Sequence, residues 1–279
     1  MTNPGTRSGR VDERLRAASF NIRTGWAWDG AHSWPLRSRA CAATLEALNA
    51  DVVGLQEVHG FQQCTLLRRL KGYAAAGAGR DDGRRRGERC SVLFRPARLD
   101  LEAWTVRWFS PTPWIPGSRG WGNPITRMVT LCRFLDRGSK QRFGVANAHW
   151  DGASATMRSR SAEALLTWLD PALPWIVLGD LNATAGDPAV AHLVAAGLRD
   201  TLAHLGERSH GAATHHPWDG STRGTRIDYV LVTPEWEALG ARIAHLCPGG
   251  QLPSDHWPVV ADLRLAHGAG PEAAGAERD

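Results

Sequence analysis

Six short segments of the sequence share one arrangement, in which an apolar run ends in a polar side chain suited to catalysis or metal binding. One of them, WIVLGDLN at 175–182, delivers Asp180 and Asn182 with a single residue between them. A lone Asp or Asn after a strand commonly forms a turn or caps a helix. Six such ends in one chain point to a shared site, because ligand-binding and catalytic groups of α/β enzymes collect where strands pass into loops. The polar residues at these ends are Asn21, Glu57, His149, Asp151, Asp180, Asn182, Asp228, Asp255 and His256.

Carboxylates, carboxamides and imidazoles gathered at one place predict phosphate chemistry with a metal ion. Buried carboxylates need a cation or mutual pairing to offset their lost hydration. Oxygen ligands suit Mg²⁺, whose remaining positions are filled by water and substrate phosphate. The five cysteines form no C-x-x-C pair, so neither a zinc site nor a disulfide framework is indicated. We expect Mg²⁺ as the cofactor, with Mn²⁺ as the alternative.

The strands and helices that must position these residues indicate an α/β protein. Helical patterns lie between some of the β-type runs, and the irregular alternation of the two argues against an eight-fold barrel. The predicted strands are 15–22, 50–58, 90–96, 128–135, 142–150, 175–181, 227–232 and 258–265. The predicted helices are 38–48, 62–70, 159–169 and 188–196.

Composition indicates one folded domain with polar ends. The chain has 279 residues, of which 43% are hydrophobic and 22% charged, enough for a sizeable core. We expect disordered tails at 1–14 and 266–279 around a domain at 15–265. The N-terminus lacks an apolar signal segment, and no apolar run approaches the roughly 20 residues that span a bilayer. A cytoplasmic monomer without membrane insertion is therefore expected.

The motifs SFNIR, LQEV, NAHWD, GDLNA, RIDYVLV and SDHWPV, in this order, resemble the endonuclease/exonuclease/phosphatase superfamily of Mg²⁺-dependent phosphoesterases, which includes DNase I-like nucleases. The resemblance covers residues 15–265. It implies a four-layer α/β sandwich, with two packed mixed β-sheets flanked by helices and the site at one edge. Three further features resemble a bacterial subgroup of largely uncharacterised members: Trp34 with Arg37, the segment 79–88, and the segment 110–127.

The resemblance also implies how the metal and the attacking water are held. Glu57 would bind the cation directly, Asn21 would assist it, and Asp255 would lie near it. Asp180 would align and deprotonate the water, and Asn182 would hold Asp180 and donate to a phosphate oxygen.

The remaining residues would act on the phosphate. Asp228 would pair with His256 and favour its imidazolium, which donates to a phosphoryl oxygen. His149 would contact the phosphate from the opposite side, and the Arg127 guanidinium would clamp it. Three more residues are predicted to contact substrate: Trp150, Asp151 and Arg158. A salt-bridged surface arginine is the alternative interpretation of Arg158.

Two loops and the tryptophans give weaker indications of where the substrate binds. The Pro-, Gly- and Trp-rich segment 107–123 is a candidate wall of the binding site. The segment 79–90 has five arginines against three acids, which fits a phosphate-recognising edge or a solvated mobile loop. Of the 13 tryptophans, we expect two or three to contact substrate and the rest to be structural.

The sequence leaves three functions open. The net charge of +5 is compatible with an acidic partner. Because no nucleic-acid-binding module is appended, we favour hydrolysis of a phosphoester in a small phosphorylated metabolite or nucleotide. A DNA or RNA endo- or exonuclease is the first alternative, with nucleic acid as its partner. A catalytically inactive binding protein is the second, although the Asp, Asn and His residues of the motifs are retained.

Overall fold

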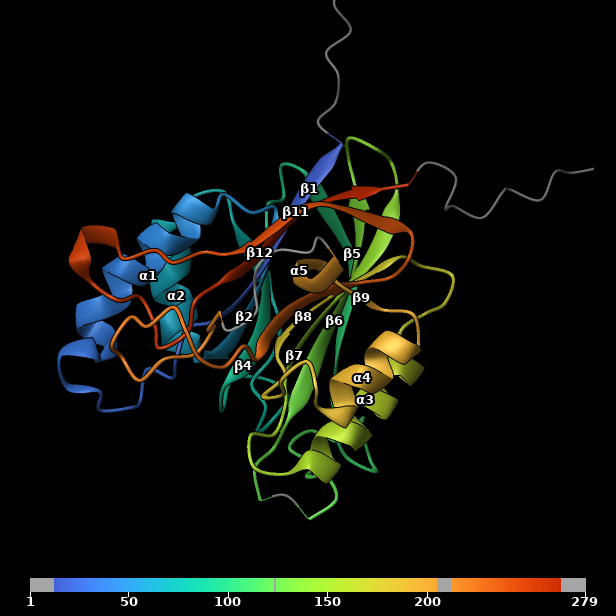
Figure 1. Ribbon diagram of the computed structural model, residues 1–279, viewed down its shortest axis with the longest axis horizontal. Helices are drawn as coiled ribbons and strands as arrows, with labels where there is room; N and C mark the ends of the chain where they lie inside the picture. The colour runs from blue at the N-terminus through green and yellow to red at the C-terminus, as the bar shows by residue number, and fades with distance from the viewer. Residues whose placement is uncertain (1–12, 123, 205–211, 267–279) are drawn as a thin grey trace, which may run out of the picture.

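Two six-stranded sheets pack face to face, and helices cover both outer faces (Figure 1). The computed structural model describes residues 13–122, 124–204 and 212–266. The architecture is the predicted four-layer α/β sandwich. The predicted tails at 1–14 and 266–279 fall almost entirely outside the described residues, but Arg14 belongs to the first strand, so that predicted boundary was wrong by one residue.

The first sheet has the order β11-β12-β1-β2-β4-β3, and only its β1–β2 pair is parallel among the described strands. Its strands are β1 (Arg14–Asn21), β2 (Val52–Val58), β3 (Ala74–Ala76), β4 (Arg89–Phe94), β11 (Trp236–Ile243) and β12 (Val259–Leu265). Its outer face is covered by α1 (Trp34–Leu48) and α2 (Gly60–Arg69).

The second sheet has the order β5-β6-β7-β8-β10-β9, with β7 and β8 parallel. Its strands are β5 (Leu99–Trp108), β6 (Met128–Asp136), β7 (Arg142–His149), β8 (Trp175–Asp180), β9 (Arg199–Asp200) and β10 (Asp228–Val232). Its outer face is covered by α3 (Ala155–Trp168) and α4 (Pro188–Ala195). The short elements α5 (Thr201–His204), η1 (Gly30–His32) and η2 (Pro248–Gly250) lie in the connections.

Each predicted strand and helix has a counterpart in the structure, but β3, β5, β9, β11 and α5 were not predicted. The longest of the missed elements, β5, is the edge strand of its sheet, and the side chains at its centre are exposed. An edge strand that faces solvent lacks the buried apolar run used to find the other strands. Within the described residues, no helix combines the length and apolarity needed to cross a bilayer.

Apolar side chains fill the space between the sheets, among them Val52, Phe134, Ile176 and Val230. One polar side chain, Asn147 of β7, crosses this interface. Its Nδ2 donates to the Leu55 and Ser91 carbonyl oxygens, both at 2.9 Å, and its Oδ1 accepts from Gln56 Nε2 at 2.7 Å. These bonds join β7 to β2 and β4 of the other sheet.

Replacing Asn147 by Ala should lower the free energy of unfolding by about 2–4 kcal/mol, because the Leu55 and Ser91 carbonyls and the Gln56 amide would lose buried partners. Urea unfolding followed by tryptophan fluorescence measures this change. The control is Thr167→Ala, at an exposed position of α3, which should change stability by less than about 0.5 kcal/mol. Equal stability of the Asn147 variant and the parent protein would contradict this role.

Candidate active site

Ends of strands from both sheets meet at one edge of the sandwich. Asn21 ends β1, His149 ends β7 and Asp180 ends β8. In the second sheet, Asp180 is opposite His149 on one side and Asp228, the first residue of β10, on the other. The parallel and antiparallel registers together therefore bring the predicted polar residues into one cluster.

The carboxylate of Asp180 lies at the centre of this cluster and is only 2% exposed. Its Oδ2 accepts from Asn21 Nδ2 at 2.9 Å and lies 3.5 Å from His149 Nε2 and 3.9 Å from His256 Nε2. Its Oδ1 accepts from the Asn182 backbone N–H at 2.9 Å. Donors on several sides thus fix the orientation of this one carboxylate.

Glu57 reaches the cluster through a backbone irregularity. The register of β2 against β4 shifts between Leu55 and Val58, and Glu57 has a positive φ of 59°. Such a bulge re-aims a side chain, and a non-glycine residue in this region costs about 1–3 kcal/mol. The strain places Glu57 Oε1 3.0 Å from Asn21 Nδ2 and Oε2 2.8 Å from the Thr24 backbone N–H. Asn21 therefore donates to Glu57 and Asp180 together.

Asp228 and His256 form a buried ion pair. Asp228 Oδ2 lies 2.9 Å from His256 Nδ1, and both side chains are almost completely excluded from solvent. Burial by itself would lower the pKa of His256, but the charge and hydrogen bond of Asp228, together with Asp180 and Asp255, raise that pKa to about 10. His256 is therefore an imidazolium at neutral pH, with its Nε2 directed toward Asp180.

The pKa values of Asp180, His149 and Glu57 are also shifted. Burial and the nearby Asp228 carboxylate raise the pKa of Asp180 to about 7, against the opposing influence of His256 and Asn21. Burial and the positive charge of Arg127 lower the pKa of His149 well below its usual value. For Glu57, burial has the largest effect and raises the pKa, but the Asn21 hydrogen bond and the His256 charge outweigh it, so the net pKa is lowered.

The donor atoms of the cluster fit a hard divalent cation. Asn21 Nδ2 bonds both Glu57 and Asp180, so two carboxylates converge on one side chain, and suitable donor atoms of Glu57, His149 and Asp180 lie within 4.8 Å of one another. Converging carboxylates with oxygen-rich surroundings are typical of sites for Mg²⁺ and similar ions. Asn21 contacts both carboxylates, through hydrogen bonds of 3.0 Å to Glu57 and 2.9 Å to Asp180.

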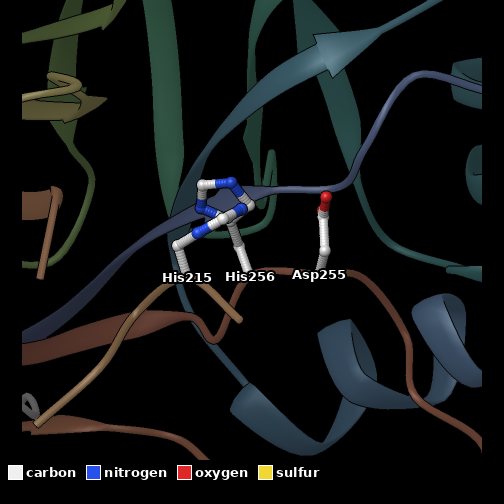
Figure 2. A group of neighbouring side chains, drawn as sticks. All are labelled: His215, Asp255 and His256. Carbon is white, nitrogen blue, oxygen red and sulfur yellow. The ribbon is translucent and has the colours of Figure 1, made fainter. Parts of the chain in front are cut away.

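A second candidate group consists of His215, Asp255 and His256 (Figure 2). The rings of His215 and His256 lie with their centroids 4.9 Å apart, while the Asp255 side chain stands beside them. In its imidazolium form, His256 has protons on both ring nitrogens, so it would have to lose one of them to ligate a metal. Asp255 Oδ2 instead lies 3.7 Å from Arg23 Nε.

Arg37 braces the loops that surround the cluster. It is completely buried in α1, and its guanidinium donates to the backbone oxygens of His32, Ile22, Arg23 and Pro253. These carbonyls lie just after β1 and just before Ser254 and Asp255. Arg37 therefore joins two segments of the site that are distant in the sequence.

Arg127 lies beside the cluster, in a small hollow. Its Nε is buried and has no hydrogen-bond partner among the described residues. The residues that line the hollow include Glu57, Arg80, Glu88, Thr126, Arg127 and His149. The 107–123 segment, expected as a wall, packs on the neighbouring 79–88 loop, since a Cβ at Gly117 would meet Asp81 O at 2.6 Å.

Trp150 does not line the site. Its side chain is 0% exposed and belongs to the core between the second sheet and its helices. The prediction that Trp150 contacts substrate was therefore wrong, because the alternation along the chain after β7 turns its indole inward. Its backbone oxygen accepts a hydrogen bond from Asn182 Nδ2 at 3.0 Å.

Asp151 and Arg158 organise the turn that leads into α3, so the structure does not support their predicted substrate contacts. Asp151 Oδ1 accepts from the backbone N–H groups of Ala153 and Ser154. Arg158 Nη2 lies 2.7 Å from Asp187 Oδ2, and Nη1 donates to the Asp151 carbonyl. Arg158 is thus salt-bridged, as in the alternative interpretation, but its side chain is only 13% exposed, so it is not a surface arginine.

Four residues of this region were not predicted as site residues: Arg23, Arg80, Glu88 and His215. Arg23 follows Asn21 by two residues in the first motif, so its position was a usable signal. Arg80 and Glu88 lie in the segment 79–90, which was noted for its charges and for its resemblance to the bacterial subgroup, but neither residue was predicted individually. His215 lies in the loop before β10, where no periodic pattern marks it.

A buried carboxylate beside an imidazolium, with a second carboxylate positioned for a cation, is the equipment of a metal-dependent phosphoester hydrolase. The sequence model of the Endonuclease/Exonuclease/phosphatase family matches residues 18–256. The chain belongs to this family, whose members are metal-dependent phosphoester hydrolases.

Solved structures with the same architecture include bacterial relatives. An endonuclease/exonuclease/phosphatase family protein from Bacteroides thetaiotaomicron is 26% identical, with a TM-score of 0.83 over 90% of this chain and 98% of that one. A mannosyl-6-phosphatase of the same organism is also 26% identical, with a TM-score of 0.81 over 90% and 100% of the two chains. Protein L388 of Acanthamoeba polyphaga mimivirus is 27% identical over 146 residues. The matched part is 49% of this chain and 54% of the viral protein, so the chain spans about half the length of that curated relative.

Proposed function

We propose that this protein is a Mg²⁺-dependent hydrolase that cleaves a phosphoester bond in a small phosphorylated metabolite or nucleotide by in-line attack of water. The arrangement around Asp180 carries this proposal. A buried carboxylate held by Asn21 and Asn182, beside the His256 imidazolium, is equipped to orient a water molecule next to a phosphate. Its pKa of about 7 suits a base that works near neutral pH.

The metal would be held by Glu57 with Asn21, and Asp255 would lie near it. When bound, the cation supplies positive charge to the phosphate oxygens and to the leaving oxygen. Two residues of the chain provide the remaining positive charge. His256 donates from Nε2 to a phosphoryl oxygen, and Arg127 binds the phosphate from the hollow beside Glu57. His149 is neutral and donates a ring N–H to the phosphate from the opposite side.

One observation supports a small substrate. A mannosyl-6-phosphatase aligns over its whole length at 26% identity. The side chains of His149, Asp180, Asp228 and His256 lie in one cluster, which supports an enzyme over a binding protein that has lost its activity.

A nuclease is the second candidate, favoured by exposed aromatic side chains next to the site. Trp26 is 74% exposed and follows Thr24, whose backbone N–H donates to Glu57. An exposed indole can stack on a nucleic-acid base. The fold is also shared with D. rerio TDP2 complexed with a single-strand DNA product, at 19% identity.

The purified protein should release phosphate from at least one of a panel of sugar phosphates, nucleotides and p-nitrophenyl phosphate. Activity should disappear with EDTA and return with Mg²⁺, because the charge of the cation is needed in the transition state. The panel also contains single- and double-stranded DNA. Cleavage of DNA without turnover of any small ester would replace the proposal by the nuclease candidate, and full activity in EDTA would exclude the metal.

A further inference from the structure

Two charged residues in the hollow beside the site, Arg80 and Glu88, have no part in the proposed chemistry. Arg80 Nη1 donates to Glu88 Oε2 at 2.5 Å. Both side chains are mostly buried, with 23% and 17% of their surfaces exposed. They line the same hollow as Glu57, His149 and Arg127, next to the cluster.

The loop that carries the pair is firmly built. The Arg80 backbone N–H donates to the Glu88 carbonyl at 2.9 Å. Asp82 Oδ1 accepts three backbone N–H groups, those of residues 84–86. Trp108 Nε1 donates to the Arg80 carbonyl at 2.7 Å. The loop is therefore a fixed support for Arg80 and Glu88, while the arginines at 84–86 are exposed to solvent.

The chemistry of the pair selects among ligands. A carboxylate accepts up to about four hydrogen bonds and a guanidinium donates five, so each partner retains capacity after their mutual bond. A second phosphate has no proton to donate to Glu88 at neutral pH and would be repelled by it. A hydroxyl group both donates and accepts, so two neighbouring hydroxyls match one carboxylate and one guanidinium.

We propose that Arg80 and Glu88 bind neighbouring hydroxyl groups of the substrate's alcohol part, so that the preferred substrates are phosphate monoesters of sugars or similar polyols. This inference rests on the proposed phosphoesterase function and narrows its substrate class. It makes Arg80 and Glu88 specificity-determining residues, which contact the leaving group without taking part in proton transfer.

The test compares kcat/KM for hexose phosphates, for the same compounds lacking one hydroxyl, and for p-nitrophenyl phosphate, which has no hydroxyl to bind. Wild-type enzyme should prefer at least one hexose phosphate over a deoxy analogue by about 10- to 100-fold. Glu88→Gln should remove most of that preference, mainly through a higher KM. Its activity on p-nitrophenyl phosphate should fall much less than its activity on hexose phosphates. Arg84→Gln, in the exposed part of the same loop, is the control and should behave as wild type.

Each contrary result has a separate meaning. Equal turnover of hexose phosphates and their deoxy analogues by wild-type enzyme overturns the inference, whatever the variants do. So does an equal loss on all substrates in Glu88→Gln, since that pattern indicates a structural or catalytic role. If the Glu88 variant does not fold, kcat/KM of Arg80→Lys, which keeps the charge, is measured on the same substrates. Failure of wild-type enzyme on every phosphate ester, p-nitrophenyl phosphate included, refutes the proposed function itself.

Discussion

Asp180→Asn should lower kcat by about 10²–10⁴-fold, because an amide cannot take the proton of the attacking water. The side chains have nearly the same shape, and the Asn182 backbone N–H can still bond the remaining oxygen. Steady-state kinetics with the best substrate of the panel and saturating Mg²⁺ measure the effect. KM should change much less than kcat, since Asp180 acts on water rather than on substrate binding.

A matched variant separates the chemistry from the loss of a buried acid. Asp136→Asn removes a carboxylate that is similarly buried and paired with Arg98, at the opposite end of its sheet. It should leave kcat within about twofold, and any effect should appear in the unfolding midpoint instead. A kcat within tenfold of wild type in the Asp180 variant would assign water activation to another group.

Asp228→Asn should lower kcat/KM at pH 8 by about 10²–10³-fold, the usual effect of removing one transition-state donor. With Asp228 present, the pKa of His256 is about 10, so the imidazolium persists across the neutral range. Without that carboxylate, the effect of burial dominates and His256 becomes neutral near neutral pH. Asp180 must be ionised and has a pKa of about 7, so the variant has almost no pH at which both groups are in their active forms.

The pH profile is the measurement that tests this pairing. Wild-type kcat/KM should fall below about pH 7 and again near pH 10, two limits that belong to the coupled Asp180 and His256. In Asp228→Asn the alkaline limit should move toward neutral pH, and in Asp136→Asn it should not move. An unchanged alkaline limit would show that His256 is not the titrating donor.

The same pair makes stability depend on pH. The pKa of His256 is raised from 6.5 to about 10 on folding, so its contribution to stability is complete below pH 6.5 and is lost as the pH rises through 10. Asp228→Asn removes this contribution, and its unfolding midpoint should be less sensitive to pH than that of wild type between 7 and 10.

Much of the fold was predictable because buried strands and amphipathic helices leave local patterns. The runs at 52–55 and 175–179 are continuous and apolar, and both lie in central strands. The edge strand at 99–108 was missed. It pairs with a neighbouring strand along one edge only, and the side chains of such a strand need not be apolar. Arg158 and Trp150 show the corresponding limit for side chains. A salt bridge to Asp187 and burial behind the second sheet depend on neighbours that are distant in sequence.

The sequence by itself determined the chemical inventory: Asn21, Glu57, Asp180, Asp228 and His256, each next to the end of an apolar segment. Only the tertiary structure decided how these groups act together. Strand registers set Asp228 opposite Asp180, and a bulge with a positive φ turned Glu57 toward Asn21. Register and backbone strain are set by packing across the sheets, whereas the type of residue at a strand end is a local property. The pKa values that separate base from donor likewise arise from burial and from charges brought together by folding.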